Sequence, residues 1–312
     1  MAYNHKKELS KPERFVGGHR LCAGCGAGLV CRGMMRALDE GDKAVVCNAT
    51  SCLEVSSFLY PYTAWEDSYI HSAFENAAAT CGGVEAAYNV LKRKGKLDST
   101  YKFLAIGGDG GTYDIGFQSL SGAMERGHDM VYFCYDNEAY MNTGIQKSSL
   151  TPFGAKTTTT PAGANAHGCL TQKKNLFEIV AAHGIPYAAT ASVGYLPDFI
   201  RKVERARAIR GTRYLHVIAP CPTGWGCGVD ETVDIAKDIV DCGLWYLAEY
   251  EGEQVCGRTG GRFKLNRDPR EFSSVEAYLR RQGRFRALSD DEVAAVEAAR
   301  DAKWEAMRRE WA

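Results

Sequence analysis

The stretch FLAIGGDGGTYDIG, residues 103–116, joins a run of β-favouring apolar residues to a glycine cluster that holds one acid, Asp109. This pattern is typical of a strand that ends where a phosphate group approaches the backbone. The glycines do not fit the dinucleotide-binding fingerprint, because Tyr113 stands where its third glycine should be. They do not fit a P-loop either, since no Gly-Lys-Ser/Thr end follows. The stretch therefore predicts a phosphate-binding turn of another kind.

An aspartate in such a turn would repel a diphosphate unless a divalent cation lay between them. Mg²⁺ takes oxygen ligands and commonly bridges a carboxylate to phosphate. A second oxygen donor is available in Asn137, which follows Asp109 by 28 residues, after one predicted helix and one predicted strand. The alternative interpretation is a tight turn with a solvated aspartate and an asparagine that caps a helix.

A GDG sequence followed at this distance by asparagine resembles the thiamine diphosphate motif, although Asp136 stands where the motif often has a first asparagine. The resemblance implies that Mg²⁺ is bound by Asp109, by the side chain of Asn137 and by the backbone carbonyl of Ala139. It further implies that glycines let the backbone approach the diphosphate, namely Gly108, Gly110 and Gly111.

Outside this stretch, segments with strand character alternate with segments of helical character. We expect helices over 27–38, 71–95 and 290–311, strands at 101–108 and 129–137, and a hairpin with an extended arm after 248. Such alternation predicts an α/β fold, a parallel sheet with helices on both faces. Ligands of these sheets bind at the carboxyl ends of the strands, where four candidate residues fall. They are Cys52, Asp109, Asn137 and Cys221.

We expect three parts in the chain: an N-terminal arm over 1–17, a thiamine diphosphate-binding domain over 18–240 that also carries the cysteines of a candidate [4Fe–4S] site described below, and a C-terminal extension over 241–312 for interfaces. The 312 residues contain 38 basic and 38 acidic side chains, so net charge attracts neither nucleic acid nor an anionic membrane. No apolar run is long enough to span a bilayer, and the charged start has no hydrophobic signal segment. We therefore expect a cytoplasmic protein.

Twelve cysteines exceed what packing needs in a chain expected to lie in a reducing compartment. Cys22 and Cys25 form a Cys-x-x-Cys pair that suits a redox dithiol, half a zinc site or half an iron–sulfur site. Cys52 and Cys221 follow strands in turns and could complete a set of four, with Cys227 as the rival for the fourth place. Packing is favoured for the cysteines within helix or strand patterns, which are Cys31, Cys47, Cys81 and Cys134.

Taken together, a series of segments resembles the β subunit of the 2-oxoacid:ferredoxin oxidoreductase family, the pyruvate:ferredoxin oxidoreductases above all. The segments run in order from about residue 18 to residue 226, with a weaker similarity in YLRRQGRF near residue 278. They are LCAGCGAG, NATSCLEV, PYTAWEDSYIHSAFENAAA, GGDGGTYDIG, DNEAYMNTGIQKSS, TTTTPAG, AAHGIPYAATAS and APCPTGWG.

The resemblance implies one [4Fe–4S] cluster close to the thiamine ring, held by Cys22, Cys25, Cys52 and Cys221. It implies that Asn142 faces the reacting centre. Residues that would line the cofactor or face it are Ser51, Cys52, Leu53, His71, Met141 and Thr143.

The implied reaction converts pyruvate, coenzyme A and oxidised ferredoxin to acetyl-CoA, CO₂ and reduced ferredoxin. Thiamine diphosphate serves as the electron sink for loss of CO₂, and the cluster takes electrons one at a time. The sequence shows neither a second thiamine domain nor a ferredoxin-like run of cysteines. We therefore expect a partner α subunit, together with γ and ferredoxin-like δ subunits or fused equivalents.

Three alternatives stay open. Oxalate or another 2-oxoacid could replace pyruvate, because a partner subunit shapes much of the pocket. The chain could be a non-catalytic zinc-binding structural subunit whose thiamine-like turn holds nothing. It could also be a thiol oxidoreductase that uses Cys22 and Cys25, although such sites normally follow a strand.

Overall fold

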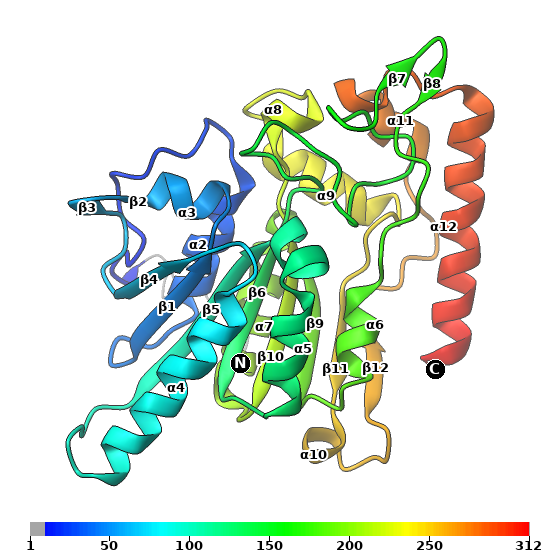
Figure 1. Ribbon diagram of the computed structural model, residues 1–312. Helices are drawn as coiled ribbons and strands as arrows, with labels where there is room; N and C mark the ends of the chain where they lie inside the picture. Colours follow the sequence, from blue (N-terminus) through cyan, green and yellow to red (C-terminus); the bar gives the residue numbers. More distant parts are fainter. Residues whose placement is uncertain (1–9, 312) are drawn as a thin grey trace.

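Eight strands form one mostly parallel sheet in a computed structural model, which describes residues 10–311 (Figure 1). The strand order is β12-β11-β9-β10-β6-β5-β1-β4. The six strands from β4 to β9 in this order run parallel to one another. At the other edge, β11 pairs antiparallel with both β9 and β12. The sheet strands are β1 (Lys43–Ala49), β4 (Ser68–Ser72), β5 (Tyr101–Gly108), β6 (Met130–Asp136), β9 (Tyr187–Ser192), β10 (Thr212–Ile218), β11 (Ala248–Glu251) and β12 (Arg262–Leu265).

Helices cover both faces of this sheet, as the alternation of the sequence predicts. The α-helices are α2 (Gly26–Arg36), α3 (Cys52–Ser57), α4 (Ala77–Arg93), α5 (Phe117–Glu125), α6 (Leu176–Ala181), α7 (Leu196–Ala208), α8 (Pro222–Trp225), α9 (Thr232–Asp241), α10 (Glu253–Cys256), α11 (Val275–Arg280) and α12 (Asp290–Glu310). Two-stranded hairpins are formed by β2 (Phe58–Leu59) with β3 (Tyr62–Thr63) and by β7 (Ala162–Gly163) with β8 (Ala166–His167).

Alternate residues of the central strands pack into two separate apolar cores. Leu104 and Ile106 of β5 face α2 and α7, whereas Phe103 and Ala105 of the same strand face α4, α5 and α6. A strand that is apolar on both faces is what a parallel sheet covered by two helix layers requires. A third core lies among α9, α11 and α12. The helical end of the C-terminal extension is therefore packed against the molecule.

Some boundaries differ from the expected ones. The segment 71–95 is not one helix, because His71 belongs to β4 and α4 begins only at Ala77. β4 instead pairs in parallel with β1 at the edge of the sheet, and this pairing places His71 opposite Asn48. The expected turn at Cys52 opens the short helix α3, and a π-helical turn over Gly111–Ile115 precedes α5. The expected hairpin after 248 is present as β11 and β12, with α10 in its loop.

Within the described residues, β11 and β12 extend the same sheet as the strands before residue 240. The expected boundary after residue 240 therefore falls in the last turn of α9, which precedes a strand pair of the common sheet, and it remains a prediction. Of the expected N-terminal arm, residues 1–9 lie outside the described part. The remainder of that arm contacts the molecule through an isolated bridge of Phe15 with Trp65.

Candidate active site

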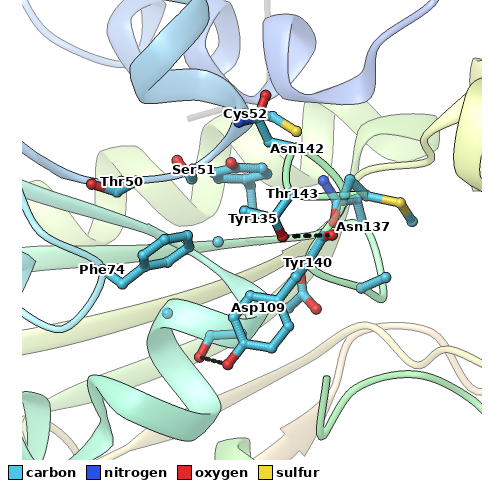
Figure 2. A pocket seen from close by; sticks show the side chains of 15 residues that line it. Thr50, Ser51, Cys52, Phe74, Asp109, Tyr135, Asn137, Tyr140, Asn142 and Thr143 are labelled. Atoms are coloured by element: carbon cyan, nitrogen blue, oxygen red, sulfur yellow. Dashed lines mark hydrogen bonds between the residues drawn. The ribbon is translucent and has the colours of Figure 1, made fainter. Parts of the chain in front are cut away.

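A pocket lies at the carboxyl ends of β1, β5 and β6, where the sequence placed its candidates (Figure 2). The strand ends contribute the glycine turn, the Asn137 turn and the start of α3. The lining residues are Thr50, Ser51, Cys52, Phe74, Gly108, Asp109, Gly110, Gly111, Tyr135, Asn137, Ala139, Tyr140, Met141, Asn142 and Thr143. Most of the predicted thiamine-site residues are thus brought to one place.

Asp109 is a buried carboxyl group, only 2% exposed, directly after β5. The hydroxyl of Ser148 donates a hydrogen bond to its Oδ2 atom at 2.5 Å. Burial, with the nearby charge of Asp136, raises the pKa of Asp109 well above its ordinary value. A cation beside Oδ1 would reverse this shift, because it favours the ionised carboxylate.

Asn137 faces Asp109 across the pocket, and its amide fits two orientations. In one orientation the amide nitrogen donates to Asp109 Oδ1 at 3.0 Å and to the carbonyl of Ala139 at 2.9 Å. In the other orientation the amide oxygen takes the place of the nitrogen. Three oxygen acceptors then face one another: the Asn137 amide oxygen, Asp109 Oδ1 and the carbonyl of Ala139. Adjacent corners of an octahedron with Mg²⁺–oxygen bonds of 2.0–2.1 Å lie about 2.9 Å apart. The Asn137 amide therefore stands from Asp109 Oδ1 and from the carbonyl of Ala139 at the spacing of neighbouring magnesium ligands.

The glycines of the turn differ in why they are needed. A Cβ atom on Gly110 would lie 2.3 Å from the ring of Tyr140, and one on Gly111 would lie 2.9 Å from the carbonyl oxygen of Phe74. A Cβ on Gly108 would meet nothing closer than 3.4 Å. Close packing within this chain thus requires glycine at 110 and 111, whereas a Cβ at 108 would make only ordinary van der Waals contacts with Tyr135 and Ser51.

The loop after Asn137 is closed on itself, with Tyr140 paired to Gln146 by backbone hydrogen bonds. The hydroxyl of Tyr140 donates to the carbonyl of Gly110 at 3.1 Å, which joins the loop to the glycine turn. Asn142 and Thr143, at the tip of the loop, are exposed. The TTTTPAG segment supports the other side, since the hydroxyl of Thr158 donates to Gly144 O at 2.9 Å.

The four predicted cluster cysteines come from three separate segments. Cys22 and Cys25 precede α2, Cys52 begins α3, and Cys221 precedes α8. Cys22 is exposed and the other three are partly exposed. By contrast, the cysteines predicted to serve packing are fully buried: Cys31, Cys47, Cys81 and Cys134.

Glycines bring these segments into contact. A Cβ on Gly24, which has a φ of +71°, would lie 2.1 Å from Val229 O, and one on Gly26 would lie 2.7 Å from the backbone of Ala219. A Cβ on Gly224 would lie 2.2 Å from the sulfur of Met141. The Cys-x-x-Cys turn is therefore packed on the Cys221 loop, and that loop is packed on the loop that carries Asn142.

The thiols affect one another electrostatically. Burial raises the pKa of Cys52 to about 12, and further contributions come from Cys221, Cys25 and Cys22, in that order. Burial likewise raises the pKa of Cys25 to about 11, with Cys221 and Cys22 adding to it. Cys227 is not among the groups that raise the pKa of either thiol. The bare thiols of Cys25 and Cys52 are therefore neutral at pH 7, and a metal centre would be required to hold them as thiolates.

Two predicted residues do not line the pocket. Leu53 is buried, and its N–H group donates to the hydroxyl of Tyr135 at 3.2 Å. The His71 side chain is 55% exposed, with its Nδ1 atom 3.3 Å from Glu54 Oε1. Sequence reasoning missed Ser148 and Tyr140, although both lie in segments that were singled out. The positions of their hydroxyl groups depend on how the loop folds, so the sequence spacing of these two residues does not indicate their contacts.

Among residues 10–311, no three His, Cys, Asp or Glu side chains stand together as ligands of a single metal ion. In the same part of the chain, no helix is both long enough and apolar enough to cross a membrane.

Comparison with known proteins relates the chain to thiamine enzymes. The sequence model of the family described as "Thiamine pyrophosphate enzyme, C-terminal TPP binding domain" matches residues 45–217. This match runs from β1 to the end of β10, so it includes the glycine turn and Asn137. Thiamine diphosphate binding is thus supported by the family and by the pocket.

Relatives of nearly the same length are oxidoreductase subunits. The chain is 48% identical to pyruvate synthase subunit PorB of Methanocaldococcus jannaschii, over 95% of this chain and 97% of that protein. It is 51% identical to the PorB subunit of Thermotoga maritima, over 91% and 85% of the two chains. It is 40% identical to ketoisovalerate oxidoreductase subunit VorB of Pyrococcus furiosus, over 98% and 96%.

Among solved structures, the 2-oxoglutarate:ferredoxin oxidoreductase from Magnetococcus marinus superposes with a TM-score of 0.60 at 20% identity. The match covers 96% of this chain and 92% of that chain, and it supports the fold. The identities to the PorB subunits carry the assignment further. The chain therefore belongs to the pyruvate synthase PorB family, the thiamine diphosphate-binding subunits of 2-oxoacid oxidoreductases.

Proposed function

We propose that this chain is the β subunit of a pyruvate:ferredoxin oxidoreductase that converts pyruvate, coenzyme A and oxidised ferredoxin to acetyl-CoA, CO₂ and reduced ferredoxin. The observation that carries the proposal is the pairing of two sites across one contact. The loop that holds Asn142 also holds Met141, and Met141 packs on the Cys221 loop. A thiamine site and a cluster site that touch suit a reaction in which electrons leave the cofactor.

The magnesium site consists of Asp109, Asn137 and the carbonyl of Ala139. Their convergence supports this assignment, and a Mg²⁺ ion held by these residues would supply the positive charge that a diphosphate needs beside Asp109. Ser148 orients Asp109 by occupying Oδ2, which leaves Oδ1 toward Asn137. Gly108 lines the same pocket, and its lack of a side chain leaves its backbone accessible to the diphosphate. Thiamine diphosphate, once bound, supplies an electron sink for loss of CO₂ from a 2-oxoacid.

Asn142 is the polar group of this chain best placed to serve the reacting centre, because it stands at the tip of a loop braced from both sides. Its amide can donate a hydrogen bond to oxygen charge that develops on the substrate. It is exposed in the single chain, whereas such groups act where water is excluded. The cover is a partner α subunit with the other thiamine domain, so the isolated chain is inactive.

The cluster is a single [4Fe–4S] centre on Cys22, Cys25, Cys52 and Cys221. A zinc ion would need all of its ligand atoms about 2.0–2.3 Å from one point. A cubane instead binds each thiolate at a different iron, so its ligands stand further apart. The mutual influence of these four thiols supports this set, and Cys227, which Cys221 also influences, is the rival for the fourth place.

Pyruvate is the favoured substrate because relatives of 45–51% identity are pyruvate synthase subunits. The ketoisovalerate oxidoreductase subunit at 40% identity makes a branched 2-oxoacid the second candidate, and oxalate remains a third. γ and δ subunits, or fused equivalents, complete the enzyme, and the δ subunit passes electrons to ferredoxin.

The test is ferredoxin reduction by the complex, purified without oxygen, on pyruvate, 2-oxoisovalerate, 2-oxoglutarate and oxalate. We expect coenzyme A-dependent turnover to be highest with pyruvate. No turnover of pyruvate, with turnover of another acid, would reassign the substrate. Zinc without iron on this chain would instead support the structural-subunit alternative. Asn142→Ala should lower kcat by about 100-fold with unchanged thiamine diphosphate affinity.

A further inference from the structure

Arg284 lies in the QGRF part of the YLRRQGRF segment, within the C-terminal extension, and the proposed function gives it no role. It is 5% exposed. Its guanidinium group lies over the ring of Trp225, 3.9 Å from the centroid, and it forms an ion pair with Glu138. Its Nε atom donates to Gln282 Oε1 at 3.0 Å, which holds the group in place. One buried cation therefore contacts two loops that are far apart in the sequence.

The first of these loops is the magnesium turn. Glu138 stands between the ligands Asn137 and Ala139, with a φ of +69°. A residue other than glycine adopts this left-handed backbone conformation at a cost in free energy, so neighbouring contacts must stabilise Glu138 in it. The ion pair with Arg284 holds Glu138 from one side, and Lys173 Nζ, 2.5 Å from Glu138 Oε1, holds it from the other. The direction of the neighbouring ligands depends on these pairs.

The second loop is the one that follows Cys221. Trp225 is fully buried at the end of α8, four residues after that thiol. Its indole N–H group donates to the carbonyl of Asn137 at 2.8 Å. The cation over its ring thus stabilises both the Cys221 loop and a hydrogen bond to the magnesium turn.

We propose that Arg284 is a positioning residue that sets the magnesium turn through Glu138 and the Cys221 loop through Trp225, and so keeps the two cofactor sites in register. The proposal rests on the proposed function. The C-terminal extension is then part of the active-site framework, in addition to any role in subunit contacts.

The experiment compares Arg284→Met with the matched control Arg286→Met in the intact complex. Arg286 is exposed, and its substitution removes the same charge two residues away. The first readout is calorimetric titration of cofactor-depleted complex with thiamine diphosphate and MgCl₂. We expect Arg284→Met to weaken binding by about 10–100-fold, the usual effect of removing a partner of metal ligands, and the control to match the wild type.

The second readout is alkylation of the native complex with iodoacetamide, resolved by peptide mass spectrometry. Bound iron protects thiolates, so wild-type Cys221 should stay unmodified. In Arg284→Met, Cys221 should become reactive while the buried Cys47 and Cys81 remain protected. A general loss of packing would expose all of these thiols alike, and that pattern would overturn the proposal.

Two milder variants separate the contacts and carry the test if Arg284→Met does not assemble. Glu138→Gln should weaken Mg²⁺–thiamine diphosphate binding but leave Cys221 protected, because Arg284 stays on Trp225. Arg284→Lys retains the charge for Glu138 but lacks the planar group. It should therefore restore cofactor affinity more than it restores protection of Cys221.

Unchanged affinity and protection in Arg284→Met, or in both milder variants, would refute the positioning role. Failure of the proposed function gives a different result. In that case the wild-type complex itself binds no Mg²⁺–thiamine diphosphate, and its Cys22, Cys25, Cys52 and Cys221 are alkylated from the outset.

Discussion

The thiamine pocket and the cysteine corner share a contact but are built in different ways. The pocket arises from the ends of three adjacent parallel strands, β1, β5 and β6, and its acid is nearly inaccessible. The cysteine corner gathers the starts of three helices, and none of its four thiols is fully buried. When neighbouring strands form a site, the distance between its residues along the sequence follows from the lengths of those strands and their connection. A site made by distant loops depends on how closely those loops can pack.

The largest effect should follow from Asp109→Asn, which breaks the pocket without changing its size. The variant loses the charge that holds Mg²⁺, so cofactor binding and turnover should fall by more than about 100-fold, beyond the loss typical of outer partners. Calorimetry with thiamine diphosphate and MgCl₂ measures the binding. Alkylation of the four cysteines should stay at the wild-type level. Loss of iron in this variant would mean that the two sites are not separable.

On the cysteine side, Cys221→Ala should remove the cluster, whereas Cys227→Ala should keep it. The reason is that Cys221 influences Cys52 and Cys25, and Cys227 is not among the groups acting on either. Iron and sulfide analysis, with peptide-resolved alkylation of Cys52, distinguishes the two variants. The reverse pattern would make Cys227 the fourth ligand, and iron retained in both would contradict the four-thiolate set.

A smaller effect is expected from Gly110→Ala, with Gly108→Ala as its matched control. A methyl group at 110 would collide with the Tyr140 ring, whereas one at 108 meets only ordinary contacts. Overpacking of this kind costs about 1–3 kcal/mol. Chemical unfolding of the cofactor-free complex should therefore show destabilisation for position 110 alone. Equal destabilisation at both positions would show that the turn as a whole tolerates no Cβ.

The smallest effect concerns the pH dependence of the iron-free protein. Cys25 has a pKa raised from 9.0 to about 11 by burial. Below pH 9 the folded and unfolded states both keep this proton, so stability does not change with pH through this group. Between pH 9 and 11 only the unfolded state loses the proton, and stability should fall by up to about 2 kcal/mol.

Unfolding titrations across this pH range measure the loss, and Cys25→Ala should show a shallower decline. A slope identical to that of the wild type would mean that Cys25 titrates near its ordinary value. Reconstitution with iron should remove the dependence, because the metal replaces the proton.

Much of the fold followed from local pattern. The strands β5 and β6, the helices α2 and α12 and the β11–β12 hairpin lie close to their expected positions, because their apolar periods are long and regular. The helix expected from residue 71 was wrong at its start, since β4 is a short edge strand stabilised by β1 and not by its own sequence. The antiparallel pairing of β11 with β9 was not expected, because a hairpin pattern shows only that its two strands pair with each other and not which strand of the sheet they join.

The sequence by itself determined the fold class, the Asp109–Asn137 spacing and the candidate cysteines, because strand alternation and ligand spacing are properties of neighbouring residues. Only the tertiary structure decided which residues support them: Ser148 on Asp109, Tyr140 on Gly110 and Arg284 between Glu138 and Trp225. The physical reason is range. A hydrogen bond, a ring packed on a glycine or a buried ion pair forms between atoms a few ångströms apart, whatever their separation along the chain.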